Sequence, residues 1–127
     1  MKALVIGYGS IGQRHARLLA ERGLSVAIVS RRQIDHSNCY GDLEMALKAW
    51  QPDYVVIASR TNEHHDDLTV LAALGFGGIV LVEKPLFHRA LAIPDNVFSR
   101  AYVAFNLRFH PVTQALKALV DGKKKLA

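Results

Sequence analysis

The chain has 127 residues, half of them hydrophobic, and a formal net charge of +5. This length suits one domain with a real core and is too short for two ordinary ones. The apolar residues come in short runs, far from the ~20 that span a bilayer, and the brief apolar start is too short for a signal peptide. We therefore expect one domain over residues 1–127, in the cytoplasm, with no membrane partner.

The basic excess of 16 Lys and Arg over 11 Asp and Glu makes nucleic acid or an anionic cofactor the partners to consider. Much of the positive charge lies in Arg31-Arg32 and in the C-terminal run Lys123-Lys124-Lys125. We expect the C-terminal run to form a loose, solvated tail. No basic stripe carries interleaved aromatic residues, so nucleic acid is not expected as a partner. The single cysteine, Cys39, has no second cysteine for a disulfide, and we expect it to be an ordinary small residue of a strand.

The first elements in chain order are a strand, a glycine-rich loop and a helix. The apolar residues 2–6 predict the strand, and Gly7-Tyr8-Gly9-Ser10-Ile11-Gly12 leads into a helical pattern over residues 13–22. Gly7 permits a tight turn, Gly9 lets a pyrophosphate approach the backbone, and Gly12 lets the helix pack closely on the strand. A second strand at 25–29 follows at βαβ spacing. This setting predicts a dinucleotide-binding loop, the alternative being a glycine-rich turn without a ligand.

The rest of the chain alternates between strands and helices. Further strands are expected at 38–40, 54–58, 79–82 and 101–105. The expected helix boundaries are Asp42 and Asn62 as N-caps, Gly75 as a stop, and Pro111 as the start of the last helix. The alternation predicts an α/β fold with a doubly wound parallel sheet of about six strands, a three-layer α/β/α Rossmann arrangement.

A charged triplet, Glu83-Lys84-Pro85, comes directly after the apolar run 79–82. In open α/β sheets, ligands bind outside the carboxyl ends of the strands, so the run delivers Lys84 to the ligand side. The alternative is a solvated loop whose proline merely ends the strand.

These motifs together resemble the N-terminal half of the glucose-fructose oxidoreductase, inositol dehydrogenase and MocA (Gfo/Idh/MocA) family. The residues that carry the resemblance are Gly7-Tyr8-Gly9-Ser10-Ile11-Gly12-Gln13-Arg14-His15, Ala58-Ser59-Arg60-Thr61-Asn62-Glu63-His64, Glu83-Lys84-Pro85-Leu86 and Ala104-Phe105-Asn106-Leu107-Arg108-Phe109-His110-Pro111. Family members are nicotinamide-dependent oxidoreductases, many acting on CH-OH groups of sugars, nucleotide sugars or cyclitols. The resemblance implies NAD(P) binding and a place in carbohydrate metabolism. It further implies that Lys84 is the catalytic residue, near substrate and nicotinamide, and that the bond before Pro85 is cis.

The residues expected to contact the dinucleotide lie at the carboxyl ends of the predicted strands. They are Gly7, Tyr8, Gly9, Ser10, Ile11, Gly12, Ser30, Arg31, Arg32, Ser59, Arg60, Thr61, Asn62, His64, Glu83, Lys84, Pro85, Asn106 and Arg108. For Asn106 and Arg108 the alternative is that they hydrogen-bond the turn into the last helix.

The chain departs from the family pattern in two places. Arg60 follows Ser59 where the family usually has a proline, and it either reaches a cofactor phosphate or is solvated. The family also continues into a second α/β domain that supplies most of the substrate pocket, and this domain is absent from residues 1–127. A proton-transfer group works only within reach of its proton in a pocket that excludes water. We therefore expect the isolated chain to be inactive, with a sugar-like substrate as partner only if a second domain is supplied.

The cofactor choice depends on the tip of the second strand, where enzymes that use NAD place an acidic residue. This chain has Ser30-Arg31-Arg32 there, which slightly favours NADP because two guanidinium groups can receive its 2′-phosphate. The alternative is that both arginines point into solvent and Asp35 folds back toward the ribose, which favours NAD.

The six histidines raise the question of a metal site, above all in the run His64-His65-Asp66-Asp67. Adjacent helical residues point about 100° apart and do not converge as ligands, so no metal is expected. His64 is interpreted as a cleft or helix-cap residue, and His15 as a residue of the first helix near the phosphate loop.

Three functions remain open at this stage. The first is the NAD(P)-binding domain of an oxidoreductase resembling sugar, nucleotide-sugar or cyclitol dehydrogenases. The second is a nucleotide-binding or regulatory module without catalytic activity. The third is a basic Rossmann-like domain that serves protein or nucleic acid partners.

Overall fold

The computed structural model describes residues 1–126 as one parallel sheet of six strands flanked by helices. The strands are β1 (Lys2–Ile6), β2 (Ser25–Val29), β3 (Cys39–Tyr40), β4 (Tyr54–Ile57), β5 (Ile79–Val82) and β6 (Arg100–Val103), in the order β3-β2-β1-β4-β5-β6. The helices are α1 (Ser10–Glu21), α2 (Leu43–Trp50), α3 (His64–Ala73) and α4 (Pro111–Leu126), with short 3₁₀ helices η1 (Thr61–Glu63) and η2 (Asn106–Phe109). The strand order reverses between β1 and β4, which confirms the predicted doubly wound Rossmann fold.

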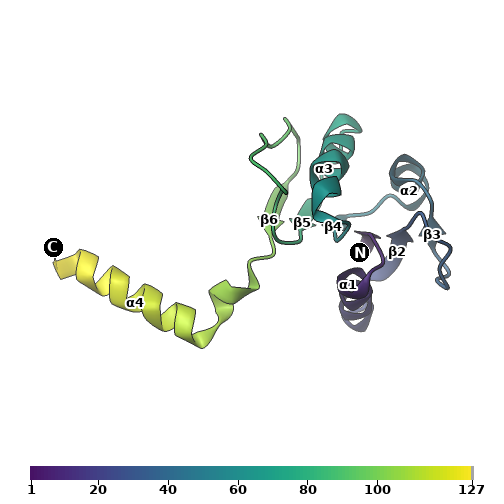
Figure 1. The fold of residues 1–127 in the computed structure, drawn as a ribbon. Helices are drawn as coiled ribbons and strands as arrows, with labels where there is room; N and C mark the ends of the chain where they lie inside the picture. The colour runs from purple at the N-terminus through teal and green to yellow at the C-terminus, as the bar shows by residue number, and fades with distance from the viewer. Residues whose placement is uncertain (127) are drawn as a thin grey trace.

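Two apolar layers, one on each face of the sheet, form the core. In Figure 1, α1 lies on one side of the strands, and α2 and α3 lie on the other. Alternate strand residues such as Val5 and Ile28 face α1, whereas others such as Leu4 and Ile57 face α2 and α3. All four side chains are fully buried, and each contributes roughly 1.5–3 kcal/mol to folding. This rigid sheet holds the carboxyl ends of its strands in a fixed row.

Helix boundaries follow the local capping chemistry, with one correction. Asp42 caps α2 as predicted, its side chain accepting a 2.9 Å hydrogen bond from the Met45 amide. Gly75 follows the end of α3 with φ of +70°. Asn62 does not cap α3, because it lies inside η1. There the amide of Arg60 donates to the Glu63 carboxylate at 3.3 Å, and this turn precedes the helix.

The connection from β5 to β6 runs over the α3 side of the sheet as irregular chain. Phe98 packs against Phe76 with ring centroids 6.3 Å apart, and Leu86 and Phe87 pack on the same apolar layer. The His65 ring bonds the Ala92 carbonyl at 3.0 Å. These contacts fix the segment that starts with Glu83-Lys84-Pro85.

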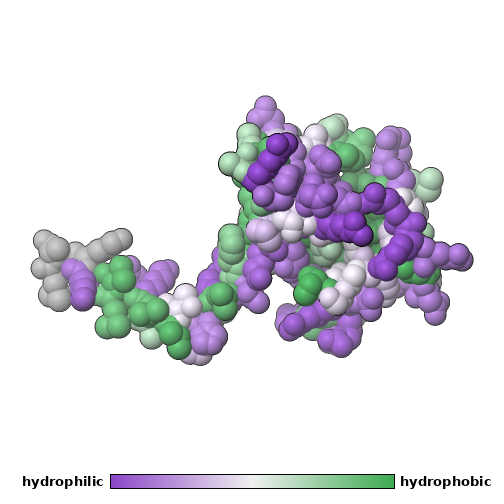
Figure 2. Space-filling model, viewed as in Figure 1, coloured by the Kyte–Doolittle hydropathy of each residue, from purple (hydrophilic) through white to green (hydrophobic). Residues whose placement is uncertain are grey.

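Helix α4 extends away from the sheet, and its main contact among the described residues is with η2 (Figure 1). Its apolar residues Val112, Leu116, Leu119 and Val120 are each more than half exposed, and Figure 2 shows this hydrophobic surface on the projecting arm. The lysine run at 123–125, predicted as a loose tail, belongs to this helix instead. None of the described helices is both long and apolar enough to cross a membrane.

Candidate dinucleotide-binding and active site

The glycine loop after β1 is packed tightly on its inner side and open on its outer side. Gly7 has φ of +94°, and a Cβ there would lie 2.6 Å from the Ala58 carbonyl oxygen. A Cβ at Gly12 would overlap the Gly7 carbonyl oxygen. A Cβ at Gly9 would meet no atom of the described chain within 4 Å. The loop therefore leaves free space at Gly9 alone, where a ligand can approach the backbone.

The start of α1 provides hydrogen-bond donors beside that space. Gly9 is the N-cap, and no side chain of the described residues caps the helix. The amide of Gln13 makes the first intrahelical bond, 2.9 Å to the Gly9 carbonyl, so the preceding amides of the first turn lack partners within the helix. The first turn also contains no acidic residue that would repel an anion. Free amides, the positive end of the helix dipole and open space together fit a pyrophosphate.

The tip of β2 brings Ser30, Arg31 and Arg32 close to this loop. The Ser30 hydroxyl accepts from the Arg32 amide at 3.2 Å, and the Arg32 guanidinium donates to the Tyr8 carbonyl at 3.3 Å. Arg31 instead reaches across the sheet and forms an ion pair with Glu63 of η1. The sequence analysis missed this pair because the two residues are 32 positions apart and no local pattern links them.

A pocket of about 130 Å³ lies beside the loop at the carboxyl ends of β4 and β5. Its lining residues are Ile11, Ala58, Ser59, Thr61, His64, Glu83 and Lys84. Six of these are among the predicted contact residues, and they come from α1, the end of β4, η1, α3 and the Glu-Lys-Pro turn. Three of the four motifs that carry the resemblance meet at this pocket.

His64 is the one polar side chain that is almost fully buried, with 1% exposed, among the described residues. Its Nδ1 faces the carbonyl oxygens of Pro85 and Leu86 at 3.1 Å each, and its Nε2 faces the Ser59 carbonyl at 3.1 Å. Carbonyl oxygens only accept, so the protonated ring nitrogen donates to one of these segments. The buried imidazole thus lies between the end of β4 and the turn that carries Lys84, and it hydrogen-bonds one of them.

Glu83 is held from the other side of the pocket. His15 of α1 bonds its carboxylate, Nε2 to Oε1, at 2.6 Å, with both side chains about four-fifths buried. The second carboxylate oxygen accepts from the Lys84 amide at 3.3 Å. The peptide bond between Lys84 and Pro85 is cis, as the resemblance implied. Lys84 itself is exposed, and no hydrogen bond of its ammonium group is found within the described part of the chain.

Ser59 and Asp67 form a polar pair behind the pocket. The Ser59 hydroxyl donates a 2.5 Å hydrogen bond to Asp67 Oδ2. Burial raises the pKa of Asp67 above its usual value of 3.8, and the Ser59 hydrogen bond and the charge of Arg31 oppose part of this rise. Asp67 is therefore a carboxylate whose charged form is penalised by the fold.

Replacing Asp67 by asparagine is expected to stabilise the chain at neutral pH. At pH values above the raised pKa, the ionised Asp67 carboxylate lowers the free energy of unfolding. This loss of stability disappears as the pH falls below 3.8, where the carboxyl group is protonated in both the folded and the unfolded chain. We expect a gain of up to about 1 kcal/mol at neutral pH, because the amide still accepts from Ser59 but carries no charge. Urea unfolding of both chains at neutral pH and below the ordinary pKa measures it. Asp66→Asn, at an exposed neighbour, is the control, and an equal gain at both pH values would contradict the assignment.

The remaining predicted contacts lie outside the pocket. Arg108 donates to the carbonyls of Val103 at 2.8 Å and Phe105 at 3.1 Å, and stacks over Phe109. These bonds hold the turn after β6, which was the alternative interpretation of Arg108. Asn106 begins η2 beside it, and Asn62 lies in η1. The Arg60 side chain is exposed and does not line the pocket.

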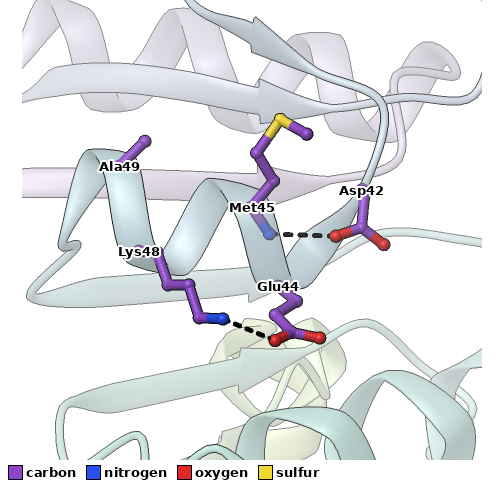
Figure 3. A pocket seen from close by; sticks show the side chains of 5 residues that line it. All are labelled: Asp42, Glu44, Met45, Lys48 and Ala49. Atoms are coloured by element: carbon purple, nitrogen blue, oxygen red, sulfur yellow. Dashed lines mark hydrogen bonds and ion pairs between the residues drawn. The ribbon is translucent and has the colours of Figure 1, made fainter.

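A larger hollow of about 470 Å³ lies on the surface of α2, away from these residues (Figure 3). Its polar groups already have partners, because Asp42 caps the helix and Lys48 bonds Glu44 at 2.7 Å. The smaller pocket, with its convergent motif residues, is the better candidate for chemistry. Within the described residues, no three His, Cys, Asp or Glu side chains gather as a metal site.

A Rossmann sheet with an open glycine loop after β1 and a lysine at the tip of β5 defines a dinucleotide-binding domain of the dehydrogenase class. Residues 1–97 match the model of the Gfo/Idh/MocA oxidoreductase family, described as an NAD-binding Rossmann fold. The chain belongs to this family. The fourth motif, at residues 104–111, lies beyond the matched range.

Solved structures of the same fold extend the likeness to nearly the whole chain. The WlbA dehydrogenase from Bordetella pertussis, in complex with NADH and UDP-GlcNAcA, has a TM-score of 0.79 at 19% identity. The myo-inositol 2-dehydrogenase from Lactobacillus plantarum has a TM-score of 0.74 at 19% identity. The alignments cover 95% and 98% of this chain, but only 42% of each of the two proteins. No curated protein matches by sequence.

Proposed function

We propose that residues 1–127 bind a nicotinamide dinucleotide and contribute Lys84 to the oxidation or reduction of a sugar-like substrate. The observation that carries the proposal is the open space at Gly9, next to the uncapped start of α1 and to the pocket that contains Lys84. A bound pyrophosphate at Gly9 would leave the rest of the dinucleotide within reach of the strand tips. When bound, the nicotinamide gives or takes the hydride.

The residues of the pocket suit the remaining parts of the reaction. The exposed Lys84 ammonium is free to bond a substrate hydroxyl or carbonyl oxygen and to move its proton. His64 and His15 act as positioning residues, since they hold the backbone at Pro85 and the Glu83 carboxylate on either side of the lysine. Ser59 and Thr61 line the same pocket and are proposed to contact the cofactor.

The substrate class is proposed from the structural neighbours. WlbA is solved with UDP-GlcNAcA, and two further neighbours are inositol dehydrogenases. A nucleotide sugar and a cyclitol both present a ring CH-OH group, which is the group that Lys84 would serve. Groups from outside residues 1–127 are proposed to complete the substrate pocket, because this chain spans 42% of those neighbours.

The cofactor proposal extends to either form of the nicotinamide dinucleotide. Ser30-Arg31-Arg32 supports NADP, and the predicted slight preference for it stays a prediction. NADH and NAD are bound in the WlbA structures from B. pertussis and Thermus thermophilus.

Calorimetric titration with NAD(H) and NADP(H) is expected to show saturable binding of at least one pair to residues 1–127. We expect weaker binding than in a complete enzyme, because the described residues cover only one side of the cofactor. Absence of binding of all four at millimolar concentration would contradict the proposal. Binding without hydride transfer, even after a second domain is joined to the chain, would instead support a regulatory nucleotide-binding module.

A further inference from the structure

The ion pair between Arg31 and Glu63 crosses the crevice of the sheet. Arg31 follows β2, and Glu63 ends η1 after β4, on the other side of the central strand β1. Dinucleotides lie across this crevice, at the point where the strand order reverses, with the adenosine ribose at the tip of the second strand. The pair therefore lies at the adenosine end of the proposed cofactor site.

Glu63 is the fixed member of the pair. One of its carboxylate oxygens accepts from the Arg60 amide at 3.3 Å, and its side chain is only 25% exposed. The Arg31 side chain is 79% exposed and reaches Glu63 from another strand. An arginine held by a carboxylate has its guanidinium donors engaged and its charge partly cancelled. It is then less available to an incoming 2′-phosphate.

No acidic residue stands in the Ser30-Arg31-Arg32 run at the tip of β2, where NAD-selecting folds usually place one. Glu63 brings a carboxylate to that region from the β4–α3 connection. This ion pair weakens the attraction of the Arg31 guanidinium for a further anion.

We propose that Glu63 determines cofactor specificity by holding Arg31 away from the 2′-phosphate of NADP. This inference rests on the proposed dinucleotide binding, and it concerns the ratio of the two affinities. The Glu63 carboxylate lowers the affinity for NADP and leaves the affinity for NAD nearly unchanged, because NAD has no phosphate at that position.

The test is the replacement Glu63→Gln, which keeps the acceptor for the Arg60 amide and removes the charge. We expect the ratio of NADP to NAD affinity to rise about three- to tenfold, the range of a partly screened charge interaction. Calorimetry with NAD and NADP measures it, and 5′-ADP and 2′,5′-ADP report the same difference without the nicotinamide half. Glu21→Gln removes a carboxylate that pairs with Arg17 at the far end of α1, and serves as the control.

The double variant Glu63→Gln with Arg31→Ala tests the route of the effect. We expect the gain from Glu63→Gln to vanish when Arg31 is absent. An equal rise in the ratio of NADP to NAD affinity without Arg31, or an unchanged ratio in Glu63→Gln, would overturn the inference. In either case, NAD binding by the unmodified chain would still support the proposed function. If the unmodified chain binds neither NAD nor NADP, the proposed function and the inference are both overturned.

Discussion

Replacing Gly9 by valine is expected to abolish dinucleotide binding and to leave the fold intact. The added Cβ enters space in which it meets no atom of the described chain within 4 Å, and the backbone φ of −75° suits any residue. The same space is the proposed seat of the pyrophosphate, so we expect the dissociation constant to rise at least about 100-fold, or about 2.7 kcal/mol. Calorimetry measures the binding, and urea unfolding measures the stability.

The same substitution at Gly12 is the matched comparison. A Cβ there overlaps the Gly7 carbonyl oxygen, so we expect Gly12→Val to cost at least about 3 kcal/mol of stability as well as binding. Replacing glycine in a helix usually gains roughly 1 kcal/mol or less, which is too little to offset a clash with backbone. Undiminished cofactor binding by Gly9→Val, with the fold intact, would show that the ligand does not lie on this loop.

Lys84→Ala is expected to reduce turnover about 10²- to 10⁴-fold, the usual contribution of a positioned acid or base. The change must be made in a chain that turns over, so residues 1–127 would be joined to the second domain of a structurally similar dehydrogenase. Lys48→Ala, at a surface lysine paired with Glu44, is the control and should leave turnover unchanged. Steady-state kinetics with a nucleotide sugar or a cyclitol measures both variants.

The chain of 127 residues alone is expected to show no measurable turnover with the same substrates. Proton and hydride transfer need groups held about 3–3.5 Å apart in a site that excludes water, and the Lys84 side chain is exposed. Robust turnover by residues 1–127 would mean that a second copy of the chain completes the site.

The fold was predictable because its signals are local. The β-branched run at 54–57 and the apolar run at 79–82 could only be buried strands, and both are strands in the structure. Asp42 and Gly75 act within a few residues of their own helices. The prediction of Asn62 as the cap of α3 was wrong. The Glu63 carboxylate accepts from the Arg60 amide and stabilises a 3₁₀ turn that already contains Asn62. The preference of asparagine for N-cap positions does not reveal such a competing turn.

The residues that line the pocket were largely predictable from the motifs, but the contacts between the motifs were not. Each motif pointed to the carboxyl end of a strand, and the shared edge of a parallel sheet brings such ends together. The contacts between motifs join residues far apart in sequence: His15 to Glu83, Arg31 to Glu63, and His64 to Pro85. Their partners depend on strand order and on side-chain rotamers, neither of which leaves a trace in the spacing of residues along the chain.

Helix α4 has a consequence for what unfolding experiments report. An isolated helix of about this length is marginal in water, and α4 gains no burial from the sheet. Its opening therefore costs far less than the opening of β1 or β4, whose residues form the core. The cooperative unit of this chain ends near η2, so a single melting midpoint describes the Rossmann sheet, and α4 gains or loses its helix largely independently of it.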